Sequence, residues 1–192
     1  MLQIEKSVRE SFETVVIGGG QAGLAVSYHL ARLRRDHVVL EQAQQAANAW
    51  RNHRWDSFTL NTPNWQSSLQ GGGIPGASRD AFLRRDEVVA YFERYITEHR
   101  LPVRYGVRVS AVEKDGEGYL VKTNTGVLLA RNVVVATGLC QTPRIPRLKG
   151  ALSLEIQQIH SDAYRNQDSL REGAVLVVGS AQSGAADCGG TV

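Results

Sequence analysis

The chain has 192 residues, which is enough for one domain and part of a second. Apolar residues make up 42% of the sequence and charged residues 21%, which is ordinary globular usage and excludes a disordered chain, a collagen-like repeat and a coiled-coil rod. The 22 basic and 19 acidic residues give a net charge of +3, and the basic pairs Arg34-Arg35 and Arg84-Arg85 are isolated, so we expect no nucleic-acid partner.

The sequence also lacks the signals of membrane and metal proteins. No apolar run approaches the roughly 20 residues of a membrane-spanning helix, and charged residues interrupt the amino terminus where a signal peptide would be apolar. Cys140 and Cys188 form neither a CxxC motif nor a metal-ligand spacing. We therefore expect a soluble cytoplasmic protein with no metal and no membrane partner; its oligomeric state stays open.

The first 40 residues predict a strand–helix–strand unit. A β-branched strand at 13–17 leads into a glycine-rich turn at 18–23, followed by a helix at 24–33 and a second apolar strand at 38–40. The right-handed crossover of such a unit makes its two strands parallel. Residues 42–80 show little periodicity, yet we expect them to be ordered because they hold four bulky aromatic side chains: Trp50, Trp55, Phe58 and Trp65.

The next region predicts a helix and then a small antiparallel sheet. Helical spacing runs from Asp86, the expected N-cap, to Ile96. Alternating apolar residues with Asp-Gly and Asn-x-Gly breaks between them predict a three-stranded meander. Its strands are expected at 107–111, 119–123 and 127–131.

Two further strands of the buried type follow the meander. One is expected at 133–136, and after a connector at 141–150 the other is expected at 174–178. The second strand ends in another glycine-containing turn at 179–184, so a strand followed by a glycine turn occurs twice in the chain. This repetition predicts two nucleotide-binding units.

The first turn fits the dinucleotide fingerprint G-x-G-x-x-G. Gly18 permits a tight turn, Gly20 leaves room for a pyrophosphate, and Gly23 lets the helix pack closely on the sheet. The amino-terminal N–H groups of the helix favour phosphate. Glu41, at the end of the second strand, is placed to accept hydrogen bonds from the two ribose hydroxyls, and its charge disfavours a 2′-phosphate. The first site therefore predicts FAD or NAD rather than NADP; a plain glycine turn with a surface glutamate is the alternative.

The second turn departs from this fingerprint at its middle position. Ala181 stands where the middle glycine belongs, and its methyl group would push a pyrophosphate outward and weaken the site. We still predict a second dinucleotide turn, with a plain strand-to-helix turn as the alternative. Its binding residues would be Gly179, Ser180, Gln182, Ser183 and Gly184.

Together, these features resemble the flavoproteins with two dinucleotide-binding domains. Three motifs, Trp50-Arg51, Phe58–Pro63 and His160–Arg165, resemble the class B flavin-dependent monooxygenases, which include the flavin-containing monooxygenases and the Baeyer–Villiger enzymes. The resemblance covers about residues 11–187. It implies an α/β fold: a Rossmann-type FAD-binding domain at 1–145 with an inserted antiparallel β-meander, and the start of a second Rossmann-type NAD(P)-binding domain at 146–192.

The resemblance also implies cofactors and a reaction. FAD would be held by the first turn, and NADPH, with NADH not excluded, by the second; oxygen would add to the reduced flavin as a C4a-hydroperoxide that oxygenates an amine or a sulfide. Thr137 and Gly138 would close over the flavin, and the backbone of Val109 would meet the adenine. The remaining FAD-binding residues would be Gly18, Gly20, Gln21, Ala22, Gly23, Glu41 and Gln42.

Two side chains outside the turns receive roles from the same resemblance, and two more match a family fingerprint. Asn61 would lie beside the reactive face of the flavin as the catalytic residue, although a turn former before Pro63 is the alternative. Trp50 would pack near the ring system, or else be a core tryptophan. His160 and Tyr164 match the fingerprint F-x-G-x-x-x-H-x-x-x-W/Y, but its phenylalanine and glycine are replaced here.

The carboxyl end departs most from the family pattern. Family members continue well beyond this length, so we expect the chain to be an amino-terminal portion that retains FAD weakly and turns over little by itself. Two alternatives remain beside the monooxygenase. A flavoprotein disulphide reductase on the same fold would need Cys140 and Cys188 to be close in space, and a non-catalytic flavin- or nucleotide-binding module would need no second half.

Overall fold

The computed structural model describes residues 10–74, 76, 78–138 and 142–179. The chain forms two compact units. The first consists of Met1–Asn48, Leu69–Gly73 and Ala90–Leu139, and the second of Ala49–Ser68, Ile74–Val89 and Cys140–Val192.

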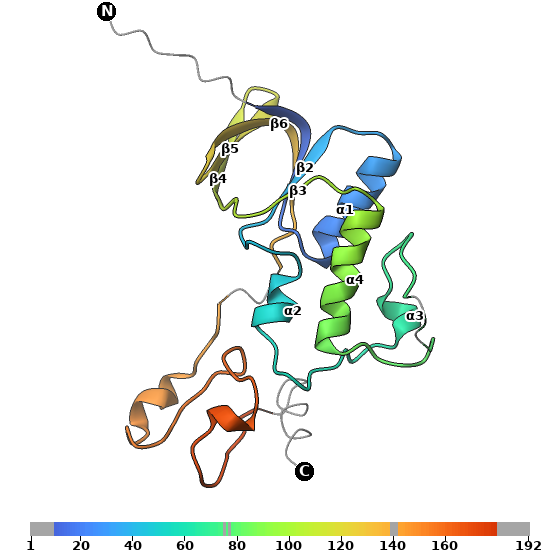
Figure 1. Cartoon of the computed structure of the whole chain (residues 1–192). Helices are drawn as coiled ribbons and strands as arrows, with labels where there is room; N and C mark the ends of the chain where they lie inside the picture. The colour runs from blue at the N-terminus through green and yellow to red at the C-terminus, as the bar shows by residue number, and fades with distance from the viewer. Residues whose placement is uncertain (1–9, 75, 77, 139–141, 180–192) are drawn as a thin grey trace, which may run out of the picture. The chain divides into compact units, whose positions relative to one another are not determined.

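The first unit is built on a six-stranded mixed sheet. Four strands run parallel, in the order β3-β2-β1-β6, and β5 and β4 continue the sheet antiparallel beyond β6. The expected α/β fold with a parallel sheet and an antiparallel meander is confirmed (Figure 1). The strands are β1 (Ser11–Ile17), β2 (His37–Leu40), β3 (Val103–Arg104), β4 (Val109–Asp115), β5 (Gly118–Thr123) and β6 (Gly126–Val135).

The prediction of separate strands at 127–131 and 133–136 is wrong. Both segments belong to β6, which pairs antiparallel with β5 near its start and parallel with β1 from Leu129 to Val135. The alternating pattern at 127–131 suits a strand with one solvent-facing side. The apolar residues at 133–135 instead pair in parallel with β1. The change of pattern therefore marks a change of partner and not a chain break.

Two helices cover one side of the parallel strands (Figure 1). The first, α1 (Gln21–Arg32), starts earlier than expected because the glycine turn itself leads into its first turn, with Gly20 as N-cap. The second, α4 (Arg85–Glu98), lies beside α1, with the rings of Tyr28 and Tyr95 5.8 Å apart. The expected N-cap role of Asp86 is wrong, because the helix begins one residue earlier.

A cluster of tyrosines ties the loop Leu69–Gly73 to the helices of the first unit. The Tyr91 hydroxyl accepts a hydrogen bond from the Leu69 N–H (2.7 Å) and donates one to the Gly72 carbonyl (3.0 Å). The Tyr95 hydroxyl donates to the Gln70 carbonyl over 2.8 Å, and its side chain is only 1% exposed. Both phenols therefore act as buried donors to a glycine-rich loop.

We expect the free energy of unfolding to fall as the pH rises from about 10 to about 12. Burial, with smaller contributions from Tyr91 and Tyr28, raises the pKa of Tyr95 from 10.0 to about 12. The unfolded chain loses this proton first, so the stabilisation is complete below pH 10.0 and is lost as the pH rises through the folded-state pKa. The difference in pKa corresponds to about 3 kcal/mol.

Urea unfolding between about pH 9 and pH 11 measures this slope. Tyr95→Phe should remove part of the slope, whereas Tyr119→Phe, a matched change at a half-buried tyrosine of β5, should keep it. Identical slopes in Tyr95→Phe and the unmodified protein would contradict the assignment.

The second unit contains little regular structure in its described part. It has the short helices α2 (Asn48–Asn52, whose first residue belongs to the first unit) and α3 (Asn64–Ser67), two 3-10 helices at Arg147–Ala151 and Gln167–Ser169, and one isolated bridge between Thr59 and Arg84. The expected strand at 174–178 is wrong: no described strand pairs with it, and Leu176 is 85% exposed. An apolar run of this type becomes a parallel strand only where neighbouring strands complete its hydrogen bonds.

Among the described residues, no helix is long and apolar enough to cross a membrane. The predicted domain boundary at residue 145 is tested by none of these features and stays a prediction.

Candidate dinucleotide site

The three glycines of the first turn occupy three different environments. Gly18 has a φ of +108°, and a Cβ at this position would lie 2.4 Å from the carbonyl oxygen of Ala136. A Cβ at Gly23 would lie 1.9 Å from the carbonyl oxygen of Gly18, so helix α1 packs directly against the turn. A Cβ at Gly20 would meet nothing within 4 Å. Only Gly20 therefore faces open space, where a pyrophosphate would lie.

The amino terminus of α1 is suited to an anion. The N-cap residue, Gly20, has no side chain with which to cap the helix, and the first turn of the helix contains no acidic residue. The first N–H groups of a helix have no intrahelical partners and carry the positive end of its dipole. Gln21 and Ala22 are exposed, so their backbone can be reached from solvent. Phosphate oxygens would satisfy these groups.

Glu41 bridges the turn and the residues that follow β2. Its Oε2 accepts a hydrogen bond from the Gly19 N–H (2.8 Å), and its Oε1 accepts one from the Ala43 N–H (2.8 Å). The Gly18 N–H donates to the Leu40 carbonyl over 2.8 Å, which holds the turn against the end of β2. The carboxylate therefore lies at the glycine turn, and exposed Gln42 lies next to it in the chain; the contact of Glu41 with a ribose stays a prediction.

We expect Glu41→Gln to raise the Kd for FAD by about tenfold to a hundredfold, because a neutral amide loses charge-assisted hydrogen bonds. The amide also has one acceptor oxygen in place of the two that now hold Gly19 and Ala43. Flavin titration followed by fluorescence measures the change. Glu117→Gln, an exposed residue in the turn between β4 and β5, is the matched control and should bind FAD normally; equal losses in both variants would contradict the role of Glu41.

The segment after β6 also lies against the first turn. The Ala136 N–H donates to the Ile17 carbonyl over 2.8 Å, and the Cα of Thr137 is 3.3 Å from the position of a Cβ on Gly18. Gly138 has a φ of +79°, which lets the chain bend away at this point. Residues 115 or more positions apart in the sequence thus meet at the carboxyl edge of the parallel strands.

Val109 lies at the start of β4, beside a shift in strand register. It pairs with Thr123, and the register slips between Val109 and Ala111. The nearby Val107 N–H donates to the Glu41 carbonyl over 2.9 Å. The chain segment that leads into Val109 therefore passes the end of β2. The contact of Val109 with adenine stays a prediction.

The remaining candidate residues before the second turn lie in the second unit. Asn61 is exposed and follows a short ladder in which the Leu60 N–H donates to the Leu83 carbonyl (2.8 Å). The half-buried Trp50 lies 5.7 Å from the ring of Phe58, and the guanidinium of Arg54 lies 5.2 Å from the Trp50 ring. Their proposed contacts with the flavin stay predictions.

The fingerprint segment around His160 is docked within the second unit. The His160 Nδ1 accepts a hydrogen bond from the Asp162 N–H (3.1 Å), and the Asp162 carboxylate lies 3.0 Å from the His53 Nδ1. Asp56 accepts hydrogen bonds from Asn166 and Arg85, which hold the pKa of its carboxyl below the usual value. Sequence reasoning did not anticipate this network, because its contacts from His53 to Asp162 and from Asp56 to Asn166 join residues more than 100 positions apart.

The second turn is described only at its first residue. Gly179 has a φ of +121°, a backbone conformation that favours glycine. Ser180, Gln182, Ser183 and Gly184 lie outside the described residues, as do both cysteines.

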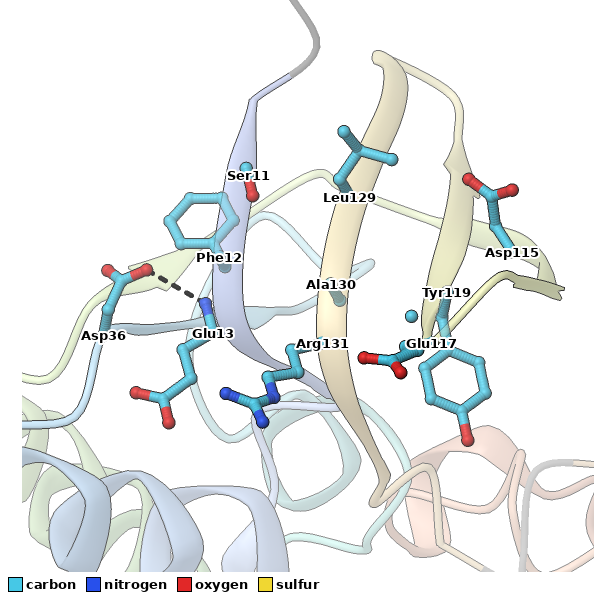
Figure 2. A pocket seen from close by; sticks show the side chains of 11 residues that line it. Ser11, Phe12, Glu13, Asp36, Asp115, Glu117, Tyr119, Leu129, Ala130 and Arg131 are labelled. Carbon is cyan, nitrogen blue, oxygen red and sulfur yellow. Dashed lines mark hydrogen bonds between the residues drawn. The ribbon is translucent and has the colours of Figure 1, made fainter.

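A recess of about 430 Å³ lies at the other end of β1 (Figure 2). Its walls carry four carboxylates, from Glu13, Asp36, Asp115 and Glu117. Asp36 accepts a hydrogen bond from the Glu13 N–H, and Arg35 pairs with the Glu13 side chain. An acidic recess repels phosphate, so electrostatics favours the glycine turn over this hollow as the dinucleotide site.

Three comparisons place the chain among flavoproteins. Residues 15–188 match the profile of the family described as "Pyridine nucleotide-disulphide oxidoreductase". The chain is 36% identical over 174 residues to the "Uncharacterized oxidoreductase CzcO" of Bacillus subtilis (strain 168), covering 91% of this chain and 50% of that protein. It is 32% identical over 187 residues to the "Indole-3-pyruvate monooxygenase YUCCA4" of Oryza sativa subsp. japonica, covering 88% and 42%.

A solved structure agrees with these relatives. A double mutant of the flavin monooxygenase from Stenotrophomonas maltophilia is 37% identical and superposes with a TM-score of 0.74, covering 82% of this chain and 47% of that one. The chain thus spans about half the length of the relatives that it matches.

Proposed function

Since the chain belongs to the pyridine nucleotide-disulphide oxidoreductase family and resembles its flavin monooxygenases, we propose that it binds FAD at the Gly18–Gly23 turn. In this proposal it supplies the flavin-binding part of an FAD- and NAD(P)H-dependent monooxygenase. The substrate is a small molecule with a soft nucleophile, an amine or a sulfide, and the second substrate is O2. The name of the YUCCA4 relative specifies a different small molecule, indole-3-pyruvate, for that protein.

One observation carries the proposal: the Glu41 carboxylate lies at the glycine turn while Gly20 faces open space. The carboxylate is held by the N–H groups of Gly19 and Ala43, so it is oriented before any ligand arrives. A Cβ at Gly20 would meet nothing within 4 Å. An uncapped helix terminus, an oriented acid and an open glycine are the elements that a dinucleotide with a free ribose 2′-hydroxyl requires.

FAD, when bound and reduced by a nicotinamide coenzyme, supplies the redox chemistry and the reaction with oxygen. The chain would bind and orient it: the first turn would hold the pyrophosphate, Glu41 would hold the ribose, and Thr137-Gly138 would cover the flavin side. By the family pattern alone, Asn61 would be the residue whose amide could donate a hydrogen bond at the reactive face of the ring. Its exposed side chain makes no hydrogen bond with the described residues, which leaves the amide available for this role.

The colour of the purified protein after reconstitution with FAD tests the proposal. A yellow protein that bleaches with NADPH and regains its colour in air supports the monooxygenase. A yellow protein that is indifferent to NADPH and NADH supports flavin binding without turnover. A colourless protein that FAD cannot reconstitute would contradict FAD binding altogether.

A second candidate function is a non-catalytic flavin-binding module. The observation that favours it concerns residues 174–178, which lead into the second turn. They form no strand and belong to no sheet among the described residues. The NADPH arm of the colour experiment separates the two candidates.

A further inference from the structure

Asn61 follows directly on a short antiparallel ladder within the second unit. The ladder has one bridge, between Thr59 and Arg84, and backbone hydrogen bonds of 2.9 and 2.8 Å flank this bridge on its two sides. Each step forward along one antiparallel segment is a step backward along the other. Two steps beyond the bridge, this register places Asn61 opposite Phe82.

The exposed fractions of the ladder residues alternate as this pairing requires. Side chains of successive residues in an extended segment point to opposite faces, and directly opposed residues share a face. Leu83 is 5% exposed and Phe58 is 9% exposed, so their face is directed inward. Thr59 and Asn61 are exposed, and Phe82 is 51% exposed. Asn61 and Phe82 therefore lie together on the outward face.

Asn64 keeps the two segments together on the other side of Phe82. Its N–H donates to the Ala81 carbonyl (2.9 Å), and its side-chain Nδ2 donates to the Ser78 carbonyl (2.8 Å). The Asn64 side chain is only 5% exposed, so water competes little for these hydrogen bonds. The backbone at Phe82 is therefore held on both sides, by the bridge at Arg84 and by the contact at Ala81.

The outward ring of Phe82 is uncovered in the part of the chain that the structure describes. No described aromatic ring or cation lies against it, whereas exposed Trp65 has the Arg79 guanidinium 5.8 Å from its ring. The other three phenylalanines of the chain are buried or half-buried. A half-exposed phenylalanine leaves about 100 Å² of apolar surface in water. Single exposed apolar side chains are common on proteins, and what distinguishes Phe82 is its place opposite Asn61.

We propose that Phe82 is a specificity-determining residue, whose ring contacts the apolar part of the substrate while Asn61 lies at the reacting end. The Cβ atoms of directly opposed residues lie about 4.5–5.5 Å apart, so a sulfur or nitrogen atom beside Asn61 has its substituents within reach of the Phe82 ring. The pair therefore favours substrates with an aryl or bulky alkyl group over substrates with methyl groups only. The inference rests on the proposed function, in which the reaction takes place beside the Asn61 amide.

Thioanisole and dimethyl sulfide test this role, because they share the sulfur and a methyl group and differ in the phenyl group. Saturation-transfer NMR measures their binding to the FAD-reconstituted protein and needs no turnover. Phe82→Ala should raise the Kd for thioanisole about three- to tenfold and leave the Kd for dimethyl sulfide unchanged, since only thioanisole loses a ring contact. Phe82→Tyr keeps the ring and should bind thioanisole like the unmodified protein. Since Phe82 is exposed, both variants should fold and bind FAD normally.

Leu154→Ala is the matched control. Leu154 is 99% exposed and belongs to the second unit, so this variant also removes an exposed apolar side chain but leaves the partner of Asn61 in place. It should bind both sulfides like the unmodified protein.

Three results would overturn the inference: normal thioanisole binding by Phe82→Ala, an equal loss for both sulfides, or no thioanisole binding by the FAD-loaded unmodified protein. A changed oligomeric state in Phe82→Ala with unchanged sulfide binding would also overturn it, and would assign the ring to a contact between copies of the chain. Failure of the unmodified protein to bind FAD would instead overturn the proposed function.

Discussion

Gly20→Val should abolish FAD binding while leaving the fold intact. The valine would place two methyl groups in the open space where the pyrophosphate must lie, and the backbone of Gly20 (φ −83°, ψ −170°) is extended and accepts a β-branched residue. Each lost charge-assisted hydrogen bond to phosphate costs about 1.5–3 kcal/mol, so the loss of two raises the Kd for FAD by at least about a hundredfold. Flavin titration measures the Kd, and circular dichroism reports the fold.

Gly73→Val is the matched control for this variant. A Cβ at Gly73 also meets nothing within 4 Å, so both valines enter open space, but Gly73 lies in the loop between α3 and α4. It should bind FAD like the unmodified protein. Equal flavin occupancy in Gly20→Val and the unmodified protein would refute the assignment of the first turn.

Gly23→Ala should have the opposite signature, a loss of stability in the absence of any ligand. The added Cβ would lie 1.9 Å from the carbonyl oxygen of Gly18, which is a backbone atom and cannot rotate away, so α1 has to move away from the turn. Overpacking of this kind costs about 3 kcal/mol, which lowers the Tm of a chain of this size by about 6–12 °C.

Thermal unfolding of Gly23→Ala beside Gly20→Ala separates packing from ligand contact. The two variants add the same methyl group three residues apart, and only the Gly23 variant should lose stability. A Tm within about 2 °C of the unmodified protein in Gly23→Ala would show that the helix does not pack on the turn as described.

Gly20 and Gly23 also show which features of the site the local sequence can predict. The fingerprint assigned open space to Gly20 and close packing to Gly23, and the structure has both features. Such assignments succeed because the glycine turn, α1 and β2 are neighbours in the chain and their geometry depends on local interactions. The same holds for the hairpins, whose Asp-Gly and Asn-x-Gly turns determine which strands pair.

Predictions were less successful for segments whose structure depends on partners that are distant in the sequence. The apolar runs at 133–136 and 174–178 look alike in the sequence, yet the first is part of β6 beside β1 and the second forms no strand. Hydrophobic pattern reports that a segment suits a buried strand, but not whether a neighbour is present to complete its hydrogen bonds. The roles of Asn61 and Trp50 rest on resemblance and are still to be tested.

By itself, the amino-acid sequence determined the glycine turn, its acidic partner Glu41 and the parallel pairing of the two strands around them, since these depend on short-range periodicity and turn chemistry. Only the tertiary structure decided which atoms hold Glu41 in place, and that Asn124 reaches across to Gly106 and Arg108. Such contacts join residues far apart in the chain, and their formation depends on packing of the whole sheet rather than on any local pattern.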